Sequence, residues 1–141
     1  MASKVVLFFL VVGFSLSTYC QSLLEYKIVA NNAGVTQLTQ AQVKEYFKGK
    51  YTLWKTGSSV KVVLHSSESK HSATLSKLLF NTSQQGVKKY WLSLVFQGRA
   101  NPPVFLNNET EIINYVKRTP GAIGIIHQNT FCPSQFIIQI K

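Results

Sequence analysis

The stretch from Val60 to Phe80 constrains the fold most, because it combines two hydrophobic patterns on either side of a polar loop. Residues 60–64 are mostly β-branched or apolar, which is typical of a buried strand. Leucines then recur at helical spacing at Leu75, Leu78 and Leu79. The sequence therefore predicts a strand, a polar loop over residues 65–71 and a helix that begins near Lys70.

The loop is rich in groups that bind anions. Several hydroxyls lie beside the start of the helix, where backbone N–H groups have no partner within the helix and the dipole attracts negative charge. The residues expected to hold a small oxyanion are Ser66, Ser67, Ser69, Lys70, His71 and Ser72. The structural alternative is that Ser69 caps the helix and the other serines solvate a turn.

Residues 1–22 have the pattern of a secretory signal peptide. Lys4 precedes an apolar run over residues 5–14, and small and polar residues follow to Ser22. The apolar run is too short for a stable transmembrane helix, which needs on the order of 20 residues. We therefore expect an exported protein, periplasmic or secreted, whose mature domain is residues 23–141.

The cleavage site is expected after Cys20 or Ser22. A lipid anchor on Cys20 is the alternative, although Tyr19 is bulky where the bacterial lipoprotein motif has a small residue. Residues 23–141 suffice for one compact domain but are short for two lobes with separate cores. Because only Cys132 remains in that domain, it can form no internal disulfide, and a thiol-linked homodimer stays open.

The charge is strongly unbalanced. The chain has 15 Lys and Arg against five Glu and no Asp, a formal net charge of +10. Such a balance favours anionic partners such as phosphate, a polyanionic envelope surface or nucleic acid. The basic residues are scattered and form no patch with interleaved aromatics, which together with export argues against nucleic acid.

Periodicity and capping motifs predict the element order β-α-β-α-α-α-β-β. The expected strands cover residues 26–30, 60–64, 122–126 and 136–140, and the expected helices begin at Thr39, Lys70, Gln84 and Asn108. Alternating strands and helices favour an α/β domain with a mixed β-sheet covered by helices on both faces. Gly124 lies within an expected strand, where it would permit a close approach.

Aromatic residues are frequent along these elements. We expect them to lie in the core and over the sheet rather than to form a platform for sugars or bases, with the role of Trp54 left open. They are Tyr46, Phe47, Trp54, Tyr90, Trp91 and Phe96.

Several segments share their order and spacing with one known family. They are Leu38–Gly49, Trp54 with Gly57, Tyr90-Trp91 leading to Phe96–Arg99, Pro102-Pro103 and Pro120–Gly124. Together they resemble the substrate-binding proteins of bacterial phosphate ABC importers, over about residues 26–126. The resemblance implies a periplasmic-binding-protein-like fold, a small anion such as phosphate as ligand, an ABC permease or another envelope component as partner, no enzymatic activity and no cofactor.

The sequence departs from this family in two respects. Where the family has an Arg-x-Asp-x-Ser-Gly-Thr-like loop, Ser66 stands at the arginine position and Lys70-His71-Ser72 replaces Ser-Gly-Thr. Ser72 is the hydroxyl that the resemblance carries over. The chain also resembles one lobe of a two-lobe protein, so a ligand would be enclosed on one side only and held more weakly, unless a homodimer completes the cleft.

Metal and hydrolase chemistry are not favoured. His65, His71 and His127 would meet if the loop faced the end of the strand over residues 122–126, but their spacing matches no zinc motif. A Ser-His-acid hydrolase would need an acid and a Gly-x-Ser-x-Gly turn, and the sequence has no such turn and no Asp. We expect no metal and no catalytic residues.

Two functions therefore stay open. The first is an exported, non-enzymatic binding protein that holds phosphate or another small oxyanion at residues 66–72. The second is an interaction or structural protein whose basic surface binds an anionic envelope component or a protein partner.

Overall fold

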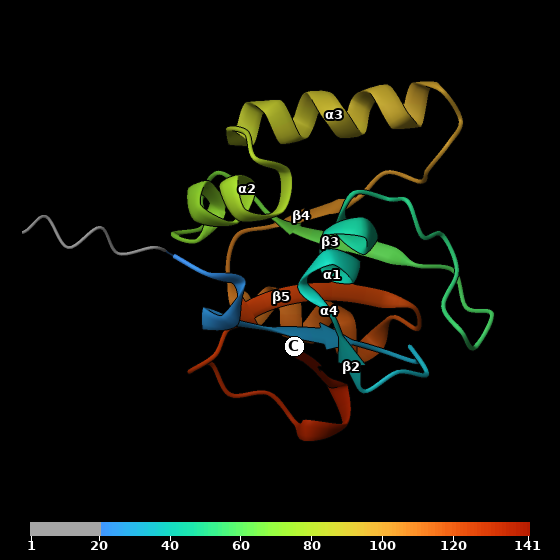
Figure 1. Ribbon diagram of the computed structural model, residues 1–141, viewed down its shortest axis with the longest axis vertical. Helices are drawn as coiled ribbons and strands as arrows, with labels where there is room; N and C mark the ends of the chain where they lie inside the picture. The colour runs from blue at the N-terminus through green and yellow to red at the C-terminus, as the bar shows by residue number, and fades with distance from the viewer. Residues whose placement is uncertain (1–20) are drawn as a thin grey trace, which may run out of the picture.

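The computed structural model describes residues 21–141 (Figure 1). The predicted signal peptide and the lipid anchor on Cys20 therefore lie outside the described residues, apart from Gln21 and Ser22. Ser22 caps a short 3-10 turn, η1 (Leu23–Glu25). Within residues 21–141, no helix is both long enough and apolar enough to cross a membrane.

The described part contains a six-stranded sheet and four α-helices. The strands are β1 (Tyr26–Ala30), β2 (Gln37–Leu38), β3 (Lys61–His65), β4 (Val104–Leu106), β5 (Ala122–His127) and β6 (Ile137–Ile140). The helices are α1 (Gln40–Phe47), α2 (Ser72–Phe80), α3 (Gln84–Phe96) and α4 (Glu109–Arg118), and a 3-10 turn, η2 (Ser134–Phe136), precedes β6.

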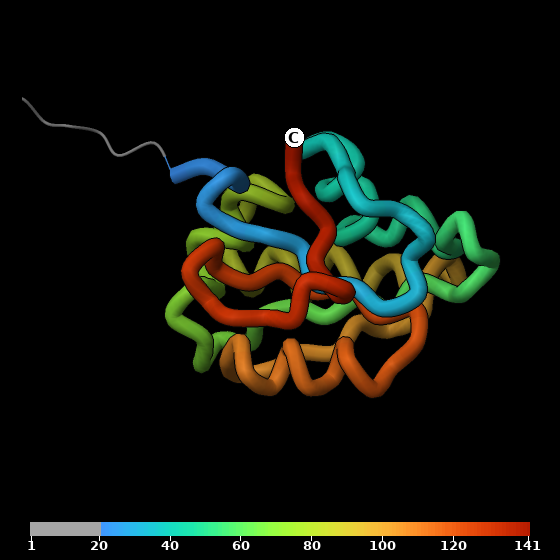
Figure 2. The backbone as a smooth tube through the Cα atoms, turned by 90° about the horizontal axis from the view of Figure 1, so that it is seen from below, coloured from blue at the N-terminus to red at the C-terminus, as the bar shows by residue number. Residues whose placement is uncertain are grey.

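The sheet is mixed, with the strand order β2-β6-β1-β5-β3-β4. Strand β1 pairs antiparallel with β5 and β6, whereas β3 pairs in parallel with β4 and β5. Helices α1 and α4 lie on opposite sides of the strands (Figure 2). The predicted α/β architecture, a mixed sheet with helices on both faces, is therefore confirmed.

Each face of the sheet packs against its own hydrophobic core. One core joins Ile28, Leu64 and Ile125 of the strands to residues of α1, α2 and α3, including Val43, Leu79 and Trp91. The other joins Val29, Val63 and Ile126 to Ile112 and Val116 of α4. Neighbouring strand residues enter opposite cores because side chains alternate along a strand. Burial on both faces explains why the strands are almost continuously apolar.

The sequence prediction missed strands β2 and β4 and started α2 at Lys70, two residues before its first helical residue, Ser72. Strand β2 has two residues and β4 has three, immediately after Pro102-Pro103, so neither is long enough to show an alternating pattern. The capping box of α1, from Thr39 to Gln42, is present as predicted.

The aromatic residues lie in the core with one exception. Trp54 stacks on Tyr46 at 4.4 Å between ring centroids, and its indole N–H donates to the Gly121 carbonyl over 2.9 Å, so it is a core residue rather than a platform. Tyr90 is partly buried and donates its hydroxyl to the Lys48 carbonyl. The prediction for Phe96 was wrong, because this side chain ends α3 on its solvent face and is 83% exposed.

Cys132 is buried in the core beneath α4, where its pKa is raised by burial. A thiol in that position cannot reach another molecule, which argues against the thiol-linked dimer.

Candidate functional site

The loop between β3 and α2 is held as two successive tight turns. The Ser69 amide donates to the Ser66 carbonyl, and the Ser72 amide donates to the Ser69 carbonyl, both over 3.1 Å. The Ser66 amide donates to the Leu106 carbonyl at the end of β4. The predicted site residues thus lie close together at the end of β3 where α2 begins.

Two of the predicted hydroxyls stabilise the loop itself. His65 Nε2 donates to the Ile125 carbonyl over 2.8 Å, so Nδ1 is the acceptor and receives the Ser69 hydroxyl at 2.6 Å. The Ser66 hydroxyl donates to Asn107 Oδ1 over 2.6 Å and accepts the Glu68 amide. Ser66 and Ser69 therefore hold the loop in place. The expectation that Ser69 caps the helix was wrong, because the N-cap of α2 is His71 and no side chain caps it.

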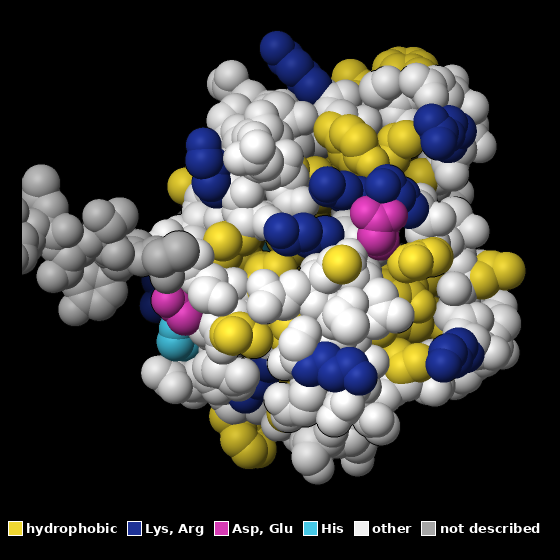
Figure 3. Space-filling view, in the orientation of Figure 1, with side chains coloured by type: hydrophobic (Ala, Val, Ile, Leu, Met, Phe, Trp, Pro, Cys, Tyr) yellow, Lys and Arg dark blue, Asp and Glu magenta, His cyan; other side chains and the backbone are white. Residues whose placement is uncertain are grey.

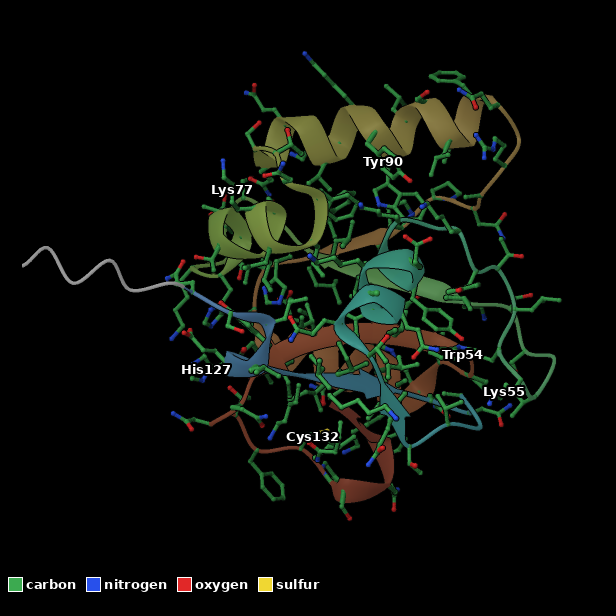
Figure 4. All side chains as sticks on the ribbon, in the orientation of Figure 1. Trp54, Lys55, Lys77, Tyr90, His127 and Cys132 are labelled. Carbon is green, nitrogen blue, oxygen red and sulfur yellow. The ribbon has the colours of Figure 1, made fainter. Side chains whose placement is uncertain are left out.

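An open hollow of about 380 Å³ lies beside the N-terminus of α2. Its lining includes Lys70, Lys77, Ser67, Ser72, Thr82 and Ser83. Figure 4 shows Lys77 on α2 beside the start of α3. No carboxylate is among the lining residues, so the hollow combines two ammonium groups with several hydroxyls. This composition suits an anion.

Ser72 has a buried hydroxyl without a partner. The residue is 5% exposed, and its Oγ makes no hydrogen bond within the described part of the chain. An unsatisfied buried hydroxyl costs about 1–3 kcal/mol, so a bound group that completes it gains that energy. Ser72 borders both the hollow and a small pocket of about 10 Å³ beside His65, which is the size of a single water molecule.

Only some backbone amides at the start of α2 donate hydrogen bonds. His71 N–H donates to Ser69 Oγ at 3.3 Å, and Ser72 N–H donates to the Ser69 carbonyl. The next two amides, those of Ala73 and Thr74, have no acceptor among the described residues. They are the free N–H groups that a helix N-terminus offers to an anion.

A second hollow, of about 410 Å³, lies on the other side of Lys70 and is lined by Glu68, Glu109 and His71 among others. Its two carboxylates oppose an anion. His71 faces this side, with Nε2 3.5 Å from Glu109 Oε1 and Nδ1 3.4 Å from the Tyr26 hydroxyl. Burial lowers the pKa of His71, opposed by Glu109 and assisted by the charge of Lys70.

The three histidines do gather at this end of the sheet. The ring centroid of His71 lies 5.8 Å from that of His65 and 5.7 Å from that of His127. Both ring nitrogens of His65 already have protein partners, and Glu109 accepts hydrogen bonds from the His127 amide and the Thr130 hydroxyl. Across residues 21–141, no group of His, Cys, Asp and Glu is arranged to hold a metal ion.

Sequence reasoning missed the part of the hollow that comes from Lys77, Thr82 and Ser83. Asn81 turns the chain between α2 and α3 in the left-handed conformation, with φ of 53°. The available signal was the short Asn-Thr-Ser link, because it keeps the start of α3 close to α2. Residues 82–84 thus line the same hollow as the loop.

The burial of His65 predicts a pH dependence of stability. Burial lowers the pKa of His65, so the unfolded chain, with an ordinary value of about 6.5, binds the proton at higher pH than the folded protein. The contribution of neutral His65 to the free energy of unfolding should therefore be fully present above about pH 6.5. It should decrease as the pH falls below that value, by at most about 1.4 kcal/mol per pH unit for one histidine. Urea unfolding at several pH values measures this, and His65→Gln should flatten the slope; an unchanged slope would contradict it.

The comparisons with known proteins identify the fold. No protein-family model and no curated protein sequence matches the chain. An ABC-type phosphate transport receptor from Vibrio cholerae aligns with a TM-score of 0.59 and 22% identity, over 83% of this chain and 47% of the receptor. PstS from Borrelia burgdorferi aligns with a TM-score of 0.61 and 14% identity, over the same shares. A structure from Clostridium perfringens that contains bound phosphate aligns with a TM-score of 0.50 and 19% identity, over 84% and 46%.

The chain spans about half the length of these proteins, 46–47% of each. At such low identity the likeness establishes the fold alone. The resemblance to phosphate ABC transporter substrate-binding proteins that the sequence indicated is confirmed at that level, and the chain aligns with about half of such a protein. The proteins it resembles are transport receptors and binding proteins.

Proposed function

We propose that this chain is an exported, non-enzymatic binding protein that holds a small oxyanion, phosphate first, in the hollow at the N-terminus of α2. The observation that carries the proposal is the pairing of Lys70 and Lys77 in a hollow without carboxylates, beside the unpartnered Ser72 hydroxyl. The shared fold with phosphate transport receptors supports a binding role.

The arrangement suits capture rather than chemistry. The ammonium groups supply charge, the Ala73 amide supplies a directed donor, and the Ser67 and Ser72 hydroxyls add hydrogen bonds to a charged group. His71 faces Glu109 across the second hollow, so it contributes to the position of the loop rather than to the anion contact. Ser66 and Ser69 act in the same indirect way.

The hollow is open, and the chain spans about half of the proteins whose fold it shares. An anion there stays partly hydrated, so the affinity is lower than that of an enclosed site. The proposal therefore includes partners that would cover the site, either a second copy of this chain or an ABC permease in the envelope.

Titration calorimetry with phosphate at low salt tests the proposal. Saturable binding is expected with Kd no weaker than about 1 mM. Ser72→Ala should weaken it about ten- to hundredfold, because it removes a hydrogen bond to a charged group. Lys70→Gln and Lys77→Gln should weaken it less, and the loss should shrink with added salt because exposed charges are screened over about 8 Å at physiological ionic strength.

The matched control is Lys55→Gln, which removes the same charge from a loop at the far side of the sheet, as Figure 4 shows. It should leave the affinity nearly unchanged. Equal losses from Lys55→Gln and Lys77→Gln would mean that only net charge matters, and absence of saturable binding to the wild-type protein would overturn the proposal.

A further inference from the structure

The solvent face of α3 carries an outer stripe of three exposed residues, Lys89, Leu92 and Phe96. They recur at i, i+3 and i+7 and so lie on one side of the helix, opposite Val87 and Trp91, which face the core. Leu92 is 57% exposed and Phe96 83%. These two apolar side chains, one turn apart, contribute little to packing within the described chain and are left for a contact outside it.

The segment of the chain that carries this stripe is basic. Residues 69–108, which contain α2, α3 and β4, include Lys70, Lys77, Lys88, Lys89 and Arg99 but no Asp or Glu. Lys88, which precedes Lys89 and lies one turn before Leu92, is also exposed. In the space-filling view, hydrophobic and basic side chains lie among other surface atoms over α3, and the acidic side chains in view lie below it (Figure 3).

We propose that the outer stripe of α3, with Lys88, docks on the surface of an anionic lipid bilayer. Lysines attract anionic headgroups, their stems can bury while the ammonium stays at headgroup level, and Phe and Leu enter the boundary between headgroups and acyl chains. Because the lysines precede Leu92 and Phe96 along α3, the end of the helix that carries Phe96 enters the bilayer most deeply.

The shape of the stripe favours a bilayer over a protein partner. The stripe is the convex outside of a single helix at one end of the molecule (Figure 1). A specific protein interface buries on the order of 800 Å² on each partner, which two exposed apolar side chains do not provide. A fluid lipid surface adapts to a convex, weakly apolar and cationic helix without a matching groove.

The docking is independent of the oxyanion hollow. Lys88 and Lys89 do not line that hollow, and the lysines that do, Lys70 and Lys77, come from the loop and α2. Free phosphate at concentrations that fill the hollow should therefore leave bilayer binding unchanged, apart from its effect on ionic strength.

Vesicle sedimentation with the wild-type protein tests the inference. Binding is expected to phosphatidylglycerol vesicles and not to phosphatidylcholine vesicles, and it should weaken as salt rises. Lys88→Gln/Lys89→Gln should lower the partition coefficient at least about tenfold, given the attraction expected for each basic residue near an anionic surface. Leu92→Ser/Phe96→Ser should lower it by about tenfold as well, since the apolar contact is lost.

Two matched controls localise the effect. Phe131→Ser removes an equally exposed aromatic, 85% exposed, from the β5–β6 connection at the opposite end of the molecule. Lys55→Gln/Lys117→Gln removes the same charge from exposed sites outside α3. All four variants change exposed side chains, and unchanged melting temperatures would confirm that they fold.

The proposal requires both controls to bind vesicles nearly as well as the wild type. If the control variants lost as much vesicle binding as the α3 variants, the proposal would be overturned, because binding would then depend on net charge or on nonspecific hydrophobic adsorption. Failure of the wild-type protein to bind phosphatidylglycerol vesicles at low salt would also overturn it and would leave a protein as the partner of α3.

Discussion

Replacing Trp91 with alanine is expected to lower the free energy of unfolding by about 3–5 kcal/mol. Trp91 is 3% exposed and is part of the core that joins α3 to the sheet. It also packs closely on Gly49 after α1, where an added Cβ would come within 2.8 Å of Trp91 Cη2. Removing the indole leaves a cavity between α1 and α3 that neither helix can close, and urea unfolding measures the loss.

Trp91→Phe is the control for this prediction. The indole N–H is buried and has no acceptor among the described residues, so phenylalanine removes an unsatisfied donor while it keeps an aromatic ring. We expect it to cost clearly less than alanine. A loss below about 1 kcal/mol for Trp91→Ala would mean that this side of α3 faces solvent or a partner rather than the core.

Replacing Gly124 with valine is expected to cost about 3 kcal/mol or more, because the sheet and α4 meet at that position. A Cβ on Gly124 would lie 2.5 Å from Ile112 Cγ2 and 3.4 Å from Val29 Cγ2. Gly124 is thus the place in β5 where α4 approaches the backbone, as the glycine in the predicted strand indicated. Thermal or urea unfolding of the variant measures the effect.

A double-mutant cycle separates this contact from the general cost of a bulkier strand residue. Gly124→Ala and Ile112→Ala should each destabilise, and together should cost less than the sum of the two, since alanine at position 112 removes the Cγ2 methyl group that the new Cβ would meet. Gly121→Ala is no substitute control, because Gly121 has φ of 84° and is strained by any side chain. Simple additivity would contradict the close approach.

The long elements could be predicted from sequence because their signals are local. The stripe of Val87 and Trp91 identified α3, the Thr39–Gln42 capping box identified the start of α1, and Asn108 identified the start of α4. Strand β4 could not be predicted, because three residues show no period and its pairing with β3 is a tertiary contact. Phe96 was assigned to the core because it follows α3's apolar residues, although its helical position is on the solvent face.

The position of the loop that carries the candidate residues could be predicted from sequence, but its internal contacts could not. Hydroxyls and Lys70 after a buried strand located the loop, and the structure places the loop at the start of α2. The sequence could not show that Ser69 bonds His65, or that Ser66 bonds Asn107, because both partners depend on how the chain folds back. For the same reason it could not show that Lys77, Thr82 and Ser83 join the hollow.

Amide chemical-shift mapping during a phosphate titration tests the central claim most directly, because it reports the position of the anion residue by residue. The account predicts saturable shifts at the amides of Lys70, Ala73 and Thr74 and at the start of α3, with Asn107–Thr110 beside the acidic hollow nearly unaffected. Shifts centred on Asn107–Thr110 or on another face, or shifts that grow without saturation, would contradict an oxyanion site at the N-terminus of α2.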